Sequence, residues 1–284
     1  MKMKKRNPAV LATLLAGAMT MPLAHAATAA PLSDAVAMPK ALTKALHDDL
    51  KLEKSFHAAG GMNGFIVSSG PGKNMVVYSP PDNSVLIAGK MVDDKGNDLS
   101  EQYLDQYGLK ADYSQLSKRI ESAPAIIEGA TGSAAKSTIY VIMDPNCIYC
   151  HLVWKALRPY QAAGLQVHWI PVAFQQPSSA GKAAALLESK DGAALLRKGE
   201  TSYVEERESL GIDEVPVSAA SKAKIDSNAA LMADLGFRGT PTILYKDKSG
   251  KFTAVEGMPK LGQLPEITGL PEKSITDAEL QRFR

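Results

Sequence analysis

The chain has 284 residues, 45% of them hydrophobic and 22% charged, and a formal net charge of +2 at pH 7. With 32 basic and 30 acidic side chains, it lacks the strongly basic surface that nucleic acid or an anionic membrane would require of its main partner. The length is sufficient for two domains, each with a hydrophobic core of its own.

The first 26 residues have the pattern of a secretory signal peptide. Basic side chains at positions 2–6 precede the mostly apolar run AVLATLLAGAMTM, and Ala-His-Ala at 24–26 is a small-x-small cleavage site. Cleavage after Ala26 would leave 28 basic and 30 acidic residues, because the removed segment holds four basic side chains and no acidic one. We therefore expect an exported protein without membrane insertion of the mature chain. A retained anchor is the alternative.

The next hundred residues predict a flexible leader, a small domain and a linker. Residues 27–39 form the leader, and an amphipathic helix is expected over 40–57, with Leu42, Leu46 and Leu50 on one stripe. Short apolar runs at 64–69, 74–79 and 84–92 are separated by turn-forming sequences and predict an antiparallel sheet beside that helix. This first domain spans residues 40–100.

Residues 101–136 are predicted to be a linker that is partly helical. A polar helix is expected to begin near Asp98 or Ser100. Beyond it, bulky side chains are scattered and Pro124, Gly129 and Gly132 interrupt the pattern. Such a stretch is typical of a domain boundary.

The second domain, residues 137–284, opens with a strand, a helix and a strand. The apolar, β-branched run STIYVIMD at 137–144 predicts a buried strand. The helix follows from Cys147 to Gly164, where Pro159 is expected to kink or end it, and 166–174 is the second strand. This order predicts a right-handed βαβ unit in a parallel or mixed sheet.

The remainder of this domain is predicted to hold a helical insertion and a hairpin. Residues 177–236 are rich in Ala, Lys, Glu and Ser and predict helices. Residues 240–257 predict a β-hairpin with its turn at Ser249-Gly250. The fold class is therefore α/β for this domain, preceded by a small α+β domain.

The two cysteines of the chain, Cys147 and Cys150, lie three positions apart. Exported proteins can keep disulfides, but a bridge closing so short a loop constrains the unfolded chain very little. The spacing favours reversible redox chemistry over a structural bridge. A zinc site is disfavoured because the histidines at 47, 57, 151 and 168 lack ligand spacing. Copper(I) binding by the two thiolates and an inert disulfide remain alternatives.

The position of Cys147, directly after a strand and at the start of a helix, favours its thiolate through the helix dipole. We therefore expect Cys147 to be the exposed nucleophile. Cys150 lies about one turn later and would resolve a mixed disulfide by attacking Cys147. Ile148 and Tyr149, between them, set the local electrostatics. His151 either adds positive charge near the thiolate or points to solvent.

A CxxC motif after a strand and opening a helix resembles the thioredoxin fold, which implies a cis-proline opposite the cysteines; Thr240-Pro241, before a predicted strand, fits it. The order of leader, small domain, linker and thioredoxin-like domain resembles the periplasmic DsbC/DsbG disulfide isomerase/reductase family. The stretches that carry this resemblance are GGMNGF, DKGNDLS, DPNCIYC, LLESKD and LMADLGFRGTPTILY.

The resemblance implies a set of functional expectations. Cys147 and Cys150 would be catalytic, supported by Thr240 and Pro241, with no separate cofactor. The cystatin-like N-terminal domain would form a homodimer, and the membrane reductase DsbD would keep the cysteines reduced in the periplasm. Clients would be exported proteins with cysteines. Family members reduce or isomerise disulfides and act as chaperones, and the DsbG branch reduces sulfenic acids.

The chain departs from the family at Ile148, where the DsbG branch usually has proline, and this difference bears on the thiol pKa and redox potential. Its tail after Leu270 is also longer than the usual family ending. Two other functions stay open: a DsbA-like dithiol oxidase that donates disulfides, and a non-enzymatic chaperone or copper-binding module.

Overall fold

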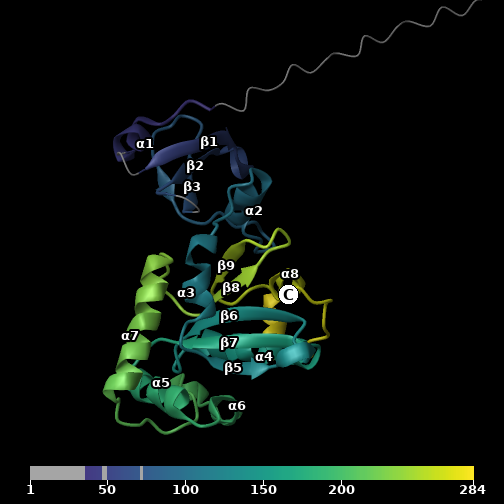
Figure 1. Cartoon of the computed structure of the whole chain (residues 1–284). Helices are drawn as coiled ribbons and strands as arrows, with labels where there is room; N and C mark the ends of the chain where they lie inside the picture. The colour runs from purple at the N-terminus through teal and green to yellow at the C-terminus, as the bar shows by residue number, and fades with distance from the viewer. Residues whose placement is uncertain (1–35, 47–49, 71–72) are drawn as a thin grey trace, which may run out of the picture. The chain divides into compact units, whose positions relative to one another are not determined.

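Two β-sheets organise the part of the chain that this computed structural model describes, residues 36–46, 50–70 and 73–284 (Figure 1). The expected signal peptide lies outside those residues. Within them, no helix has the length and apolar character needed to cross a membrane.

The first sheet has four antiparallel strands in the order β1-β2-β3-β4. Their bounds are Lys51–His57, Asn63–Ser68, Asn74–Ser79 and Ile87–Ala88. Two helices accompany the sheet, α1 over Lys40–Ala45 and α2 over Leu99–Gln106. The predicted antiparallel sheet is confirmed, as is a helix beginning near Asp98, whose carboxylate accepts a hydrogen bond from the backbone N–H of Glu101.

The helix expected over residues 40–57 is wrong beyond Ala45, because residues 51–57 form strand β1. The apolar residues of this stretch face two sides of the sheet. Leu42 packs with Phe65, Val67 and Val77, whereas Phe56 packs with Ile66, Val76 and Tyr78. Pairing of β1 with β2 places Phe56 opposite Gly64 in the sheet, and the helical spacing of the leucines gives no sign of this pairing.

The second sheet has five strands in the order β5-β7-β6-β8-β9. Their bounds are Ile126–Gly129, Leu165–Pro171, Ser137–Met143, Thr242–Lys246 and Phe252–Glu256, in that spatial order. Strands β6 and β7 are parallel and joined by helix α4, Ile148–Ala162, which confirms the predicted strand-helix-strand unit. The hairpin of β8 and β9 is also confirmed.

Strand β5 is a correction, since residues 126–129 were assigned to the linker. The rest of that stretch is partly helical as expected, with α3 over Ser117–Glu121. In β5, Ile126 and Glu128 are buried and alternate with exposed neighbours, so one face of the strand is covered. The strand pairs only with β7 and forms one edge of the sheet. The unit containing the cysteines therefore begins before Ile126, rather than at residue 137.

Alternate side chains of β6 point to opposite faces of this sheet, and each face is covered by helices. Ile139, Val141 and Met143 face α4 and α8 (Leu264–Thr268). Tyr140 and Ile142 face the other way and share a cluster with α3 and α7 (Ala219–Asp234). The predicted helical insertion contains α7 together with α5, Ser179–Glu188, and α6, Gly192–Thr201.

Helix α4 continues past Pro159 to Ala162, so the expectation that this proline could end the helix is wrong. Leu157 and Tyr160, on either side of Pro159, are both fully buried. Their packing against the sheet holds the last turn in place although the proline removes one backbone donor. Gly164 then takes a positive φ of 114° after the helix. The remaining short 3-10 segments are Ala59–Gly61, Ser114–Leu116, Gly132–Ala134, Glu205–Arg207, Leu261–Gln263 and Glu279–Phe283.

Candidate active site

The cysteine pair lies at the turn between β6 and α4. Cys147 is the residue before the first turn of α4, with extended backbone angles of φ −105° and ψ 115°, and both thiols are free. The backbone N–H of Cys150 donates to the carbonyl oxygen of Cys147 over 3.1 Å. The chain thus turns from the strand into the helix at the first cysteine.

A buried carboxylate, Asp144, holds this turn against the neighbouring loops. Its Oδ1 accepts hydrogen bonds from the backbone N–H of Asn146 and from the hydroxyl of Ser179, over 2.9 and 2.7 Å. Its Oδ2 accepts from the backbone N–H groups of Phe174 and Gln175, over 2.8 and 3.1 Å. Four donors satisfy the carboxylate, which explains how a charge can be buried here.

Thr240 and Pro241 lie beside the first cysteine, and the peptide bond between them is cis. The Cys147 thiol donates to the carbonyl oxygen of Thr240 over 3.3 Å. Cys147 is only 5% exposed, so the expectation of an exposed nucleophile is wrong. The reason is tertiary: a segment far along the chain lies against the sulfur. Of the two residues between the cysteines, Tyr149 is 49% exposed and Ile148 is half-buried.

The surroundings of Cys147 stabilise its thiolate. The pKa of Cys147 is lowered from 9.0 to about 7, chiefly by a hydrogen bond from the thiol of Cys150 and against the opposing effect of burial. Hydrogen bonds from the side chain of Thr240 and from the backbone N–H groups of Cys150 and Tyr149 contribute to the same lowering. The backbone groups at the helix start contribute, as the sequence predicted, but the second thiol contributes most.

Cys150 has the opposite electrostatic environment. It is 1% exposed, and burial raises its pKa well above 9.0. The hydrogen bond that it donates to Cys147, and the charge there, raise the pKa further. Near neutral pH the pair therefore combines one partly ionised sulfur with one protonated sulfur. This is the division of roles that a nucleophile and a resolving thiol require.

Of the two expectations for His151, the one that it points to solvent is wrong. It is 7% exposed, and its Nδ1 is 2.7 Å from Oε2 of Glu200 in α6. Its ring stacks on that of Tyr203, with centroids 4.2 Å apart. Burial raises the pKa of Glu200, and the hydrogen bond and charge of His151 oppose that rise. The insertion therefore contributes to the surroundings of the cysteines.

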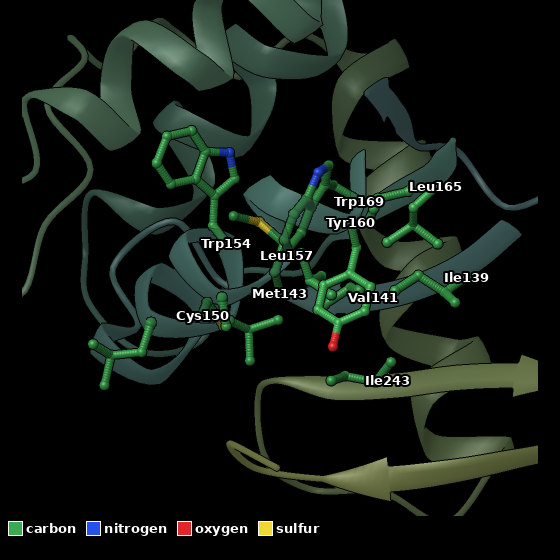
Figure 2. Packing of buried hydrophobic residues seen from close by; sticks show 14 of the residues in the cluster. Ile139, Val141, Met143, Cys150, Trp154, Leu157, Tyr160, Leu165, Trp169 and Ile243 are labelled. Carbon is green, nitrogen blue, oxygen red and sulfur yellow. The ribbon is translucent and has the colours of Figure 1, made fainter. Parts of the chain in front are cut away.

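Trp154, on α4, and Trp169, on β7, pack in the same hydrophobic core (Figure 2). Their indole N–H groups both donate to Oε2 of the buried Glu128, over 3.1 and 3.2 Å. The guanidinium of Arg158 bonds Oε1 of the same carboxylate over 2.7 Å and lies over the ring of Trp154. This network ties edge strand β5 to the helix that carries the cysteines.

Sequence reasoning missed several residues of this site. Asp144 stands in the quoted motif DPNCIYC, and its place between a buried strand and the cysteines was an available signal. Glu200 and Tyr203 lie about fifty residues beyond the motif in a polar helical stretch, and no local pattern distinguishes them. Glu128 lies within residues 101–136, which were predicted to be a linker, so its role was missed.

Comparison with known proteins gives consistent relatives. A family model described as a thioredoxin-like domain matches residues 124–267. The thiol:disulfide interchange protein DsbG of Pseudomonas aeruginosa is 30% identical over 216 residues, which cover 76% of this chain and 82% of that protein. DsbG of Escherichia coli is 30% identical over 217 residues, covering 76% and 85%. A solved structure of Helicobacter pylori DsbG covers 72% of this chain and 97% of its own at 18% identity, with a TM-score of 0.37.

Proposed function

Because the chain belongs to the DsbG family of thiol:disulfide interchange proteins and carries a thioredoxin-like domain, we propose that it reduces and isomerises disulfides of exported proteins through Cys147 and Cys150. One observation carries this proposal. The pKa of Cys147 is lowered to about 7, while that of the adjacent, buried Cys150 is raised. An inert disulfide or a structural thiol pair needs no such difference.

In the first step the Cys147 thiolate attacks one sulfur of a client disulfide. A bond forms between Cys147 and that sulfur, the client S–S bond breaks, and the second client sulfur leaves as a thiolate with the electron pair. Cys150 then loses its proton and attacks the Cys147 sulfur. The client is released with two electrons gained, and the Cys147–Cys150 disulfide forms. For isomerisation, another client thiolate attacks the mixed disulfide and returns Cys147 reduced.

The supporting residues have distinct roles in this scheme. The carbonyl and side chain of Thr240 both bond the Cys147 sulfur, so this residue orients the nucleophile. Pro241 follows Thr240 and restricts the backbone of the segment that lies against the Cys147 sulfur. Tyr149 is exposed at the helix start, where a client chain must pass to reach the sulfur. Ile148 supplies a half-buried apolar group in place of the usual proline.

Replacing Cys147 with serine tests the function directly. We expect the Cys147→Ser chain to fold and to lose both insulin reduction and the reshuffling of a scrambled disulfide protein. Serine keeps the size of the side chain but is a far weaker nucleophile near neutral pH. Activity at the parent level would contradict the assigned chemistry.

The compartment and the reducing partner are part of the same proposal. The residues 1–26 would direct export to the periplasm, and the membrane reductase DsbD would return the pair to the dithiol. A count of free thiols in protein taken directly from the periplasm checks this. Mostly reduced protein, becoming oxidised when that reductase is removed, is expected; fully oxidised protein in both strains would favour the disulfide-donating oxidase.

We also propose that residues 40–100 mediate a homodimer, linked through residues 101–125 to the catalytic domain. Val85, Ile87 and Val92, all in this region, are 52%, 46% and 55% exposed, so their side chains are available to an apolar interface. Ile87→Asp should give monomers in sedimentation experiments, because a charge in an apolar interface must be desolvated. Ile127→Asp, at a 47% exposed site on β5, is the matched control and should sediment like the parent.

Such a dimer would face two thiol sites toward one client, and the family's chaperone activity and its reduction of sulfenic acids belong to this proposal. In the sulfenic acid reaction the Cys147 thiolate attacks the client sulfur, and the S–OH oxygen leaves as water after taking a proton. Cys150 then resolves the mixed disulfide as before. Loss of client protection in the Ile87→Asp chain, with insulin reduction retained, is the expected result.

A further inference from the structure

The helical insertion contains a cavity of about 820 Å³, lined by α5, α6 and the segment 204–215 that follows them. Helices α5 and α6 contact each other in this part of the chain (Figure 1). Apolar side chains form part of the lining: Ala185, Leu195, Val204, Leu210, Ile212 and Val215. The volume lies within the usual range of ligand sites, about 300–1,000 Å³.

A buried ammonium group, that of Lys182 on α5, lines this cavity. Lys182 is 7% exposed, and its Nζ donates to the hydroxyl of Ser209 and, over 2.6 Å, to the carbonyl oxygen of Leu210. Among the residues that the structure describes, no carboxylate forms an ion pair with this nitrogen. An ammonium has three N–H donors, so one of them is left for a further acceptor. Because lysine is rarely buried without an anionic partner, this donor indicates a place for one.

The charges around the cavity favour a negatively charged ligand in its interior. Two further basic side chains, Lys198 and Arg207, line it, and neither forms an ion pair within residues 36–46, 50–70 and 73–284. Burial lowers the pKa of Lys182 and the charge of Arg207 lowers it further, against the opposing effect of more distant carboxylates. The acidic residues of the lining are all exposed: Glu188, Asp213 and Glu214. The buried charge is therefore positive, and a carboxylate would complement it.

The wall of the cavity is bonded directly to the active-site turn. Ser178 and Ser209 both line the cavity and both contact the side chain of Asn146, the residue before Cys147. Nδ2 of Asn146 donates to the hydroxyl of Ser178 over 3.0 Å, and the hydroxyl of Ser209 donates to its Oδ1 over 2.8 Å. One side chain thus connects the residue before the nucleophile with two residues of the cavity.

A second connection runs through the loop after β7. Gln176 lines the cavity, and its Nε2 donates to the carbonyl oxygen of Arg207 over 2.9 Å. The preceding residue, Gln175, is 3.5 Å from Oγ1 of Thr240 through its own Nε2. The carbonyl oxygen of Thr240 accepts from the Cys147 thiol. The cavity therefore adjoins the two segments between which Cys147 lies, the turn at Asn146 and the loop beside Thr240.

We propose that this cavity binds an extended segment of the client chain, and that the ammonium of Lys182 donates a hydrogen bond to an acidic side chain of that segment. Lys198 and Arg207 add positive charge around the same carboxylate. A client attached to Cys147 brings its neighbouring residues to the cavity at high local concentration, which favours a client carboxylate over a free one. The inference rests on the proposed reaction with exported clients, and it names a class of them: chains with an acidic residue near the reacting cysteine.

Two short peptides, capped at both ends and identical except for one glutamate or glutamine, test this by calorimetric titration of the full-length chain. Both carry serine in place of cysteine. We expect the glutamate peptide to bind roughly tenfold more tightly, because its hydrogen bond to the ammonium is charge-assisted. Lys182→Gln keeps an N–H donor but removes the charge, so it should abolish the difference. Lys190→Gln, at an exposed lysine between α5 and α6 and outside the lining, is the matched control and should retain it.

Equal affinity of the parent for the two peptides, or a difference that persists in Lys182→Gln, would overturn the proposal. Acetate is the third arm: if it binds as tightly as the glutamate peptide, the site takes small free carboxylates and the assignment to client chains is overturned. The comparison of the two peptides on the parent needs no substitution, so it decides the matter even if Lys182→Gln folds poorly. Neither peptide has a thiol, so a failure here is separate from the loss of insulin reduction that would contradict the proposed function.

Discussion

The sulfur of Cys147 lies 3.3 Å from the carbonyl oxygen of Thr240, although 93 positions separate the two residues along the chain. This contact buries the first cysteine to 5% exposure while its pKa stays near 7. Burial alone would raise the pKa of a thiol. Directed hydrogen bonds therefore outweigh desolvation at this sulfur, and reactivity is achieved without wide exposure.

Cys150→Ser should trap the mixed disulfide between Cys147 and a client. Serine removes the resolving thiol, so the second step stops while the first proceeds. Non-reducing electrophoresis followed by mass spectrometry should reveal clients attached to Cys147 by a disulfide that a reductant cleaves. The Cys147→Ser chain, treated in the same way, is the control and should form none. Adducts of equal yield in both variants would contradict the assigned order of attack.

The stability of the reduced protein should depend on pH through its two thiols. Because the folded pKa of Cys147, about 7, lies below its unfolded value of 9.0, its contribution grows from pH 7 to 9 and is lost as pH falls through 7. The pKa of Cys150 is raised by burial, so its contribution is present below pH 9 and is lost above it. Together they predict a maximum near pH 9.

Urea unfolding of the reduced parent and of the Cys147→Ser/Cys150→Ser chain across pH 6–10 checks this prediction. The difference between the two curves isolates the thiols from all other titrating groups. A difference that stays flat between pH 7 and 9 would show that Cys147 has an ordinary pKa in the folded chain, and one that does not fall above pH 9 would show the same for Cys150.

Glu128→Ala should destabilise the fold strongly, by about 3–5 kcal/mol, because it leaves two buried indole donors and the half-buried guanidinium of Arg158 without their acceptor. The carboxylate is 1% exposed and accepts from Trp154, Trp169 and Arg158. Denaturant unfolding followed by tryptophan fluorescence measures the loss. Glu121→Ala is the control: its ion pair with Lys246 is largely exposed, and its loss should cost less than about 1 kcal/mol.

Gly64→Ala should destabilise the N-terminal sheet. Gly64 pairs with Phe56 across β1 and β2, and a Cβ at this position would lie 2.4 Å from the Phe56 ring. Displacing that fully packed ring should cost roughly 1–3 kcal/mol. At Gly89 a Cβ meets no heavy atom within 4 Å, so Gly89→Ala should change stability by less than about 0.5 kcal/mol. Equal effects of the two substitutions in thermal unfolding would refute this reading of the close contact.

Local sequence was sufficient for the elements that carry the cysteines. The β-branched run at 137–144 predicted β6, the apolar spacing after Cys147 predicted α4, and the turn at Ser249-Gly250 predicted the hairpin. In each case neighbours a few positions apart encode the element through propensity and periodicity, and burial of one face then reinforces the same choice.

Tertiary structure decided the rest. Leu42, Leu46 and Leu50 have the spacing of a helix, but the residues that follow them, 51–57, pair with β2 and form a strand. The sequence determined that two thiols stand at the start of a helix after a buried strand. Only the fold brought Thr240, Glu200 and Tyr203 to that turn, because hydrogen bonds and stacking act over a few ångströms in space and leave no trace in the spacing of residues so far apart along the chain.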